Sequence, residues 1–181
     1  MRPATNSSPT AGLPCFKLTN ATIEFIGEAI PIEFRPNLRA RGSEVHASTF
    51  LHRRLIILDS ALLRNRPERE RILAHEIFHF VWWKAPAIRA AYADRIHQEF
   101  ASGIKGEMGW SAEWRKLELK PADLKHHTRR FRDYLCESFC DSSACLLLRI
   151  SRHPEITLPA RARRARRNFF EAYVAGRRLK I

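Results

Sequence analysis

The chain has 181 residues, of which 45% are hydrophobic, enough for one domain with a substantial core. It has no run of about eighteen apolar residues and no apolar leader, so we expect neither a transmembrane helix nor a secretory signal. The net charge of +13 favours an acidic partner, either nucleic acid or an acidic protein substrate, although a solvated arginine-rich surface explains it equally well.

The domain organisation is expected to be simple. We predict that residues 1–12 form a flexible tail and that residues 13–181 form a single domain. Three of the four cysteines fall within one predicted helix, which does not fit a disulfide framework, so we expect reduced thiols and a cytoplasmic location. The four are Cys15, Cys136, Cys140 and Cys145.

The first part of the chain predicts one short helix and three strands. Apolar residues recur at helical spacing over residues 20–30, and Pro31 would end that helix. Apolar runs predict strands at residues 32–34, 44–51 and 54–58. The third strand is the most apolar, so we expect it at the centre of the sheet, in an antiparallel hairpin with the second.

A long helix is predicted from Asn65 to about Lys84. Asn65 can cap its first amides, and Pro67 is tolerated in the first turn. Most sides of this helix are apolar, which is typical of a buried helix.

Residues 86–124 have weaker patterns. An apolar residue every four positions predicts a helix that ends near Gly103. A glycine-rich loop follows, and then a short helix that Ser111 can cap. We expect Trp110 and Trp114 to anchor this region in the core rather than to form a substrate-binding lid.

A second long helix is predicted over residues 128–150. Phe131 and Leu135 belong to an apolar stripe at helical spacing, and Glu137 and Asp141 lie on a more polar stripe. Carboxylates on an otherwise apolar helix are unfavourable to bury unless they are paired or bound to a metal.

A basic final helix is predicted over residues 160–178. Five arginines lie between Arg161 and Arg167. They predict weak, salt-sensitive binding to the phosphates of nucleic acid, with a solvated basic face as the alternative.

The first long helix contains the sequence His75-Glu-Ile-Phe-His79. Positions i and i+4 lie one above the other on a helix, so the two imidazoles can bind one Zn²⁺. Glu76 can then act as the general base for a water activated by the metal. This spacing predicts a zinc hydrolase; the alternative is an ordinary amphipathic helix with two surface histidines.

The third zinc ligand is left open by the residues themselves. A catalytic zinc usually takes three protein ligands and keeps one position for water. We expect the cysteines to be small core residues rather than ligands. The possible donors are His126, His127, Cys136, Glu137, Cys140 and Asp141.

At this point the chain resembles a known family. The histidine motif followed by Glu137 and Asp141 on a later helix resembles the gluzincins, a group of zinc peptidases. More narrowly, about residues 20–150 resemble the ImmA/IrrE-type metallopeptidases, with residues 86–124 as an insertion. The runs that carry this likeness begin at Arg54, Arg71 and Glu137.

The resemblance implies a site and a function. It implies that His75, His79 and Glu137 bind zinc, and that Asp141 orients a ligand histidine. It also implies an intracellular, site-specific peptidase whose substrate is a regulatory protein such as a transcriptional repressor.

These features predict an α+β, zincin-like fold, with a small, mostly antiparallel sheet packed on two long metal-binding helices. Glu76 would move a proton from water to the leaving amine, and a histidine or tyrosine would stabilise the oxyanion. The candidates for that last role are Tyr134, His126 and His127. Two other functions stay open, a non-enzymatic zinc-binding regulator and a nucleic-acid-associated protein.

Overall fold

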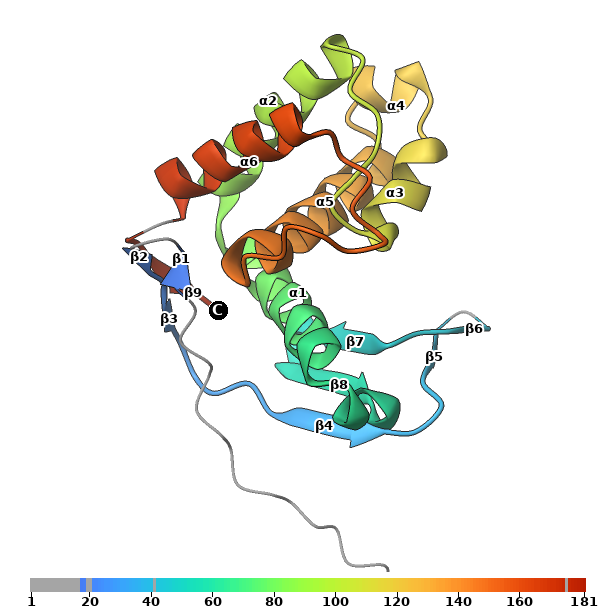
Figure 1. Cartoon of the computed structure of the whole chain (residues 1–181), viewed down its shortest axis with the longest axis vertical. Helices are drawn as coiled ribbons and strands as arrows, with labels where there is room; N and C mark the ends of the chain where they lie inside the picture. Colours follow the sequence, from blue (N-terminus) through green and yellow to red (C-terminus); the bar gives the residue numbers. More distant parts are fainter. Residues whose placement is uncertain (1–16, 19–20, 41, 175) are drawn as a thin grey trace, which may run out of the picture.

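The computed structural model describes residues 17–18, 21–40, 42–174 and 176–181. Over these residues the fold is α+β, with helices and short strands in separate parts of the structure (Figure 1). The expected tail over residues 1–12 lies outside the described residues, as does Cys15. Within the described residues, no helix combines the length and the apolar character that crossing a membrane requires.

The main sheet has three strands in the order β4 (Ile32–Arg35), β8 (Leu55–Asp59), β7 (Ala47–Phe50). The central position of the 54–58 strand is confirmed, and its residues Ile56 and Leu58 are fully buried. The antiparallel hairpin of β7 and β8 is also confirmed. However, β4 runs parallel to β8, so this sheet is mixed rather than mostly antiparallel.

The short strands form three further pairs. The pairs β1–β2 and β5–β6 are antiparallel, whereas β3 runs parallel to β9. Their bounds are β1 (Lys17–Leu18), β2 (Ala21–Thr22), β3 (Glu24–Ile26), β5 (Arg39–Ala40), β6 (Ser43–Glu44) and β9 (Arg178–Lys180).

The predicted helix over residues 20–30 is wrong, because this segment contains β2 and β3. Phe25 and Ile26 favour the extended backbone, and β9 supplies the hydrogen-bonding partner of β3 from the far end of the chain. Gly27 follows with φ +153°, and a Cβ there would lie 2.5 Å from the carbonyl oxygen of Ile181. The close approach of these two backbones therefore requires a glycine.

Helix α1 (Arg66–Lys84) begins and ends where the sequence predicts. The Asn65 side chain accepts a hydrogen bond from the Glu68 amide at 3.3 Å, which caps the first turn. The second long helix, α5 (Arg129–Leu147), is capped by Thr128. The two helices pack together through rings such as Phe78 and Phe139, whose centroids are 5.7 Å apart.

Helix α1 also contacts β7, so it lies between the main sheet and α5 (Figure 1). Two 3₁₀ turns complete this part of the chain. The first, η1 (Leu51–Arg53), connects the hairpin, and the second, η2 (Ser60–Arg64), leads into α1. The arrangement brings an outer strand and two helices to one place.

The region between the long helices contains α2 (Pro86–Ala101), α3 (Trp110–Leu117) and α4 (Pro121–Lys125). Gly109, not Ser111, occupies the N-cap of α3. The expected core role of the two tryptophans is wrong, since Trp110 is 64% exposed and Trp114 is 36% exposed. Helix α3 packs through its other face, where Ala112 is fully buried.

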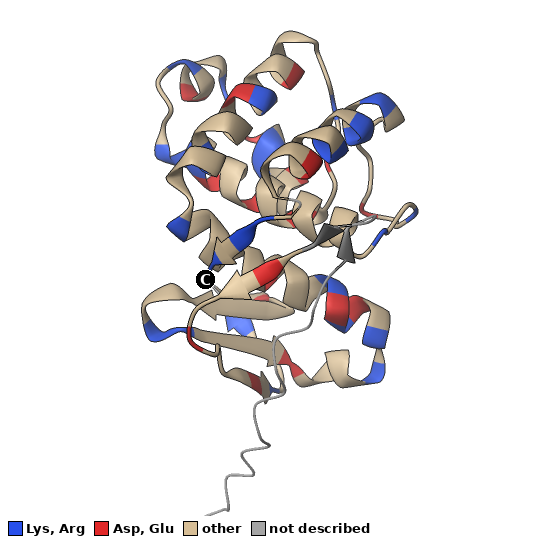
Figure 2. Cartoon of the chain, turned by 90° about the vertical axis from the view of Figure 1, so that its left-hand side faces the viewer, with Lys and Arg blue, Asp and Glu red and all other residues tan. Residues whose placement is uncertain are grey.

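The final helix, α6 (Ala160–Tyr173), is shorter than the predicted range of residues 160–178, since β9 follows it. It lies beside α2 and buries Phe169, Phe170 and Arg166 (Figure 1). Figure 2 shows lysines and arginines spread over several helices and loops of the side in view.

Candidate metal centre

His75 and His79 project together from one face of α1. Their Nε2 atoms are 3.2 Å apart and their ring centroids are 5.0 Å apart. This proximity follows from the i, i+4 spacing on a regular helix. Both side chains are half-buried, so their polar atoms need partners from neighbouring elements.

Helix α5 supplies two carboxylates to the same place. Glu137 Oε2 lies 3.3 Å from His75 Nε2, and Asp141 Oδ1 lies 2.8 Å from His75 Nδ1. Each carboxylate thus faces a different nitrogen of one imidazole. This is the arrangement that the sequence resemblance implies for a ligand and for the residue that orients a histidine.

Asp141 is held firmly by the start of α3. Its Oδ2 accepts hydrogen bonds from the Ala112 amide and from Ser111 Oγ, both at 3.0 Å. A Cβ added to Gly109 would lie 2.4 Å from the Asp141 carboxyl carbon, so only glycine permits this approach. With Oδ2 occupied, Oδ1 is left to accept the proton of His75 Nδ1, which determines the imidazole tautomer.

That tautomer places a lone pair on His75 Nε2. The lone pair points toward Glu137 Oε2 and His79 Nε2, which are electron-rich atoms as well. Burial by itself lowers the pKa of His75, but the Asp141 and Glu137 carboxylates raise this pKa well above its ordinary value of 6.5. The cluster therefore stabilises a cation at this point, either a proton or a metal ion.

The spacing of these donor atoms fits zinc. Ligand atoms that lie about 2.0–2.1 Å from a tetrahedral zinc are separated from each other by about 3.3–3.4 Å. The two distances at His75 Nε2, 3.2 Å to His79 and 3.3 Å to Glu137, are close to this value. Two imidazoles and a carboxylate are also a usual ligand set for catalytic zinc.

Two cysteines of α5 lie nearer to the histidines than expected. Ligand atoms of His75, His79 and Cys140 fall within 4.8 Å of one another, which makes Cys140 a rival third donor. Cys136 Sγ lies 3.3 Å from His79 Nδ1. A hydrogen bond with Cys140, followed in effect by the charge of His79, lowers the pKa of Cys136 to about 6. The prediction that the cysteines only fill the core is therefore incomplete.

The carboxylate of Glu76 faces the main sheet. Glu76 Oε2 accepts a hydrogen bond of 2.5 Å from Thr49 Oγ1 on β7, and the Glu76 side chain is largely buried. Arg115 on α3 lies 3.4 Å from Glu137 Oε1 and covers the ring of Trp114. No local sequence pattern identifies Thr49 or Arg115, because both depend on contacts between distant elements.

The three oxyanion candidates lie elsewhere. The Tyr134 hydroxyl donates to Glu107 Oε1 at 2.5 Å, inside a buried polar network. His127 Nε2 is 3.2 Å from His97 Nε2, and His126 is exposed at the end of α4. These contacts direct the candidates away from the His75 and His79 cluster, so the expected role of all three is wrong.

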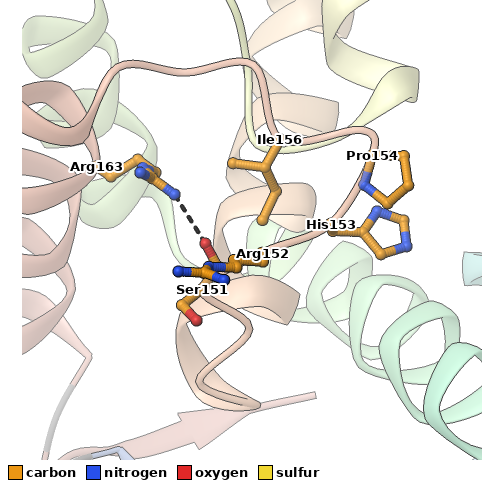
Figure 3. Close-up of a pocket in the computed structure, with 6 residues that line it drawn as sticks. All are labelled: Ser151, Arg152, His153, Pro154, Ile156 and Arg163. Atoms are coloured by element: carbon orange, nitrogen blue, oxygen red, sulfur yellow. Dashed lines mark hydrogen bonds between the residues drawn. The ribbon is translucent and has the colours of Figure 1, made fainter.

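A surface pocket lies between the end of α5 and α6 (Figure 3). Its lining is basic, and Arg163 donates to the carbonyl oxygen of Ser151 at 3.0 Å. The pocket contains none of the residues that surround His75 and His79. Its lining residues are Ser151, Arg152, His153, Pro154, Ile156 and Arg163.

Comparisons of this chain with protein families, with curated proteins and with solved structures find no match.

Proposed function

We propose that this protein is a zinc-dependent peptidase of the gluzincin type, with a zincin-like fold. The observation that carries the proposal is the convergence of three donor atoms, with His75 Nε2 lying 3.2 Å from His79 Nε2 and 3.3 Å from Glu137 Oε2. The Glu76 carboxylate follows the first of these ligands in the chain. The resemblance to ImmA/IrrE-type metallopeptidases agrees with this set of residues.

In this proposal His75, His79 and Glu137 hold Zn²⁺. When bound, zinc would supply a Lewis acid that acidifies water and polarises the scissile carbonyl. Asp141 keeps the proton on His75 Nδ1, so that His75 Nε2 is available as a ligand. Glu76 accepts a proton from the attacking water and delivers it to the leaving amine.

The proposed substrate is an extended segment of a regulatory protein in the cytoplasm. Strand β7 is an outer strand of the β4–β8–β7 sheet, and outer strands can pair with an added peptide strand. The same strand carries Thr49, which contacts Glu76. A peptide bound along β7 would therefore pass close to the general base. A transcriptional repressor as the substrate comes from the sequence resemblance alone.

The test compares wild-type protein with Glu76→Gln after both are loaded with zinc. Each is incubated with a pool of peptides from a digested proteome, and new peptide termini are identified by mass spectrometry. We expect cleavage by the wild type, and a loss of about 10²–10⁴-fold in the variant with its zinc content unchanged. A zinc-loaded wild type that produces no new termini would contradict the proposed function.

Cys140 favours a second candidate, a non-enzymatic zinc-binding regulator. It is buried, and its sulfur lies within 4.8 Å of ligand atoms of both histidines. Thiolate ligands are common in closed structural sites, which leave no position for water. In that case Cys140→Ser would lose zinc, Glu137→Ala would retain it, and no variant would cleave peptides.

A further inference from the structure

We propose that Thr49 is a positioning residue for Glu76, a role that rests on the proposed peptidase function. Thr49 Oγ1 lies 2.5 Å from Glu76 Oε2 and 3.4 Å from the backbone carbonyl oxygen of Glu76. One hydroxyl on the sheet therefore contacts both the carboxylate and the backbone of the general base. In this role Thr49 restrains Glu76 but does not itself touch the substrate.

Thr49 is suited to this role because its own position is restrained. It is paired with Ile56 of β8, which is fully buried at the centre of the sheet. A β-branched side chain has few χ1 rotamers, so the hydroxyl has little freedom to turn away. Successive strand residues face opposite sides, so Ser48 cannot replace Thr49 in this contact.

The hydrogen bond has a defined chemical effect. The hydroxyl donates its proton to Oε2, which leaves Oε1 of Glu76 to accept the proton of the attacking water. A glutamate side chain has several rotatable bonds, and without this contact it can adopt rotamers that point Oε1 elsewhere. Catalytic groups that are misplaced by about 1 Å can lose about 10²-fold in rate.

The experiment uses Thr49→Val, which keeps the shape of the side chain but removes the hydroxyl, and Thr49→Ser, which keeps the hydroxyl. Ser48→Ala on the same strand is the matched control. Zinc content, kcat and KM are measured with a peptide that the wild type cleaves. We expect Thr49→Val to lower kcat about 10- to 100-fold, with KM and zinc content unchanged. Thr49→Ser and Ser48→Ala should stay within about threefold of the wild type.

If Thr49→Val does not fold, Thr49→Ala provides the same comparison with a smaller side chain. Full turnover in a folded variant without the hydroxyl would overturn the positioning role. An equal loss in Thr49→Ser would overturn it too, because the hydroxyl would then not be the active feature. These outcomes differ from failure of the proposed function, in which the wild type itself cleaves no peptide and the role of Thr49 falls with it.

Discussion

Arg166 Nη1 of α6 lies 2.6 Å from Glu107 Oε2, and both side chains are completely buried. The same guanidinium pairs with Glu99 of α2 at 2.7 Å and donates to Ser138 and Ser142 of α5. Breaking a buried ion pair by removing one partner leaves the other charge uncompensated. The final helix is thus joined to the protein interior by one of its arginines.

We therefore expect Arg166→Met to lower the free energy of unfolding by about 3–5 kcal/mol. The exposed Arg164 provides the control, since Arg164→Met should change stability by about 0.5 kcal/mol or less. Urea unfolding followed by circular dichroism measures both. Equal stability of the two variants would show that the buried pairs contribute nothing.

Stability should also depend on acid through Glu107. Burial raises the pKa of Glu107, but Arg166 has the greater combined effect and lowers this pKa from 4.5 to about 2 in the folded protein. Ionised Glu107 therefore stabilises the fold fully above pH 4.5, and its contribution is lost as the pH falls through about 2. Urea midpoints measured between pH 5 and pH 2 should fall over this range, and the fall should be smaller in Glu107→Gln.

The metal-free protein should respond to alkali through His79. Burial lowers the pKa of His79, but Cys136 raises it, to about 9 in the folded protein against 6.5 as the ordinary value. Protonated His79 thus stabilises the metal-free fold fully below pH 6.5, and this contribution is lost as the pH rises through about 9. Thermal melting with a chelator present measures the loss, which should be smaller in Cys136→Ser.

Zinc should reverse that trend. A metal ion binds the neutral imidazole, so binding releases the proton of His79 and becomes tighter as the pH rises. We expect the increase in melting temperature on adding zinc to grow between pH 6.5 and pH 9. A zinc effect that does not change with pH would contradict competition between the metal and a proton at this site.

The third ligand can be identified by comparing three variants. If Glu137 is a ligand, Glu137→Ala should lose most of the bound zinc while Cys140→Ser retains it. Asp141→Asn should weaken zinc binding about 10- to 100-fold, because Asp141 orients His75 without binding the metal. Metal content after dialysis measures all three. Full zinc occupancy in Glu137→Ala would rule out the gluzincin ligand set.

Nucleic-acid binding by α6 is testable with its outward-facing arginines. Arg166 is buried, so the contact with phosphates must come from residues such as Arg161 and Arg164, which are exposed. We expect weak, sequence-independent retardation of duplex DNA at low salt that is reduced in Arg161→Ala/Arg164→Ala. A gel shift at low salt with no retardation would instead indicate a solvated basic face.

Sequence patterns predicted the elements whose causes are local. Helix α1 follows from its cap at Asn65 and its apolar faces, and the i, i+4 spacing of His75 and His79 is a property of any regular helix. The central position of β8 follows from its apolar run. The approach of α5 to α1 came instead from a resemblance, since no local rule places Glu137 beside His75.

The features that were not predicted depend on distant partners. Residues 24–26 have helical apolar spacing, but β9 pairs with them as a strand. Trp110 and Trp114 are aromatic residues of the kind found in cores, yet α3 turns Ala112 inward because its first turn meets Asp141. In these cases tertiary contacts override the local pattern.

The parallel pairing of β3 with β9 affects how the protein is made. Glu24 and Arg178 form an ion pair across these strands, although 154 positions separate them in the chain. At a synthesis rate of about 5–20 residues per second, β3 waits roughly 8–30 s for its partner strand to be translated. During that time its backbone amides and carbonyls form an open edge that other chains can join. We expect nascent chains of this protein to depend on chaperones until the last strand has emerged from the ribosome.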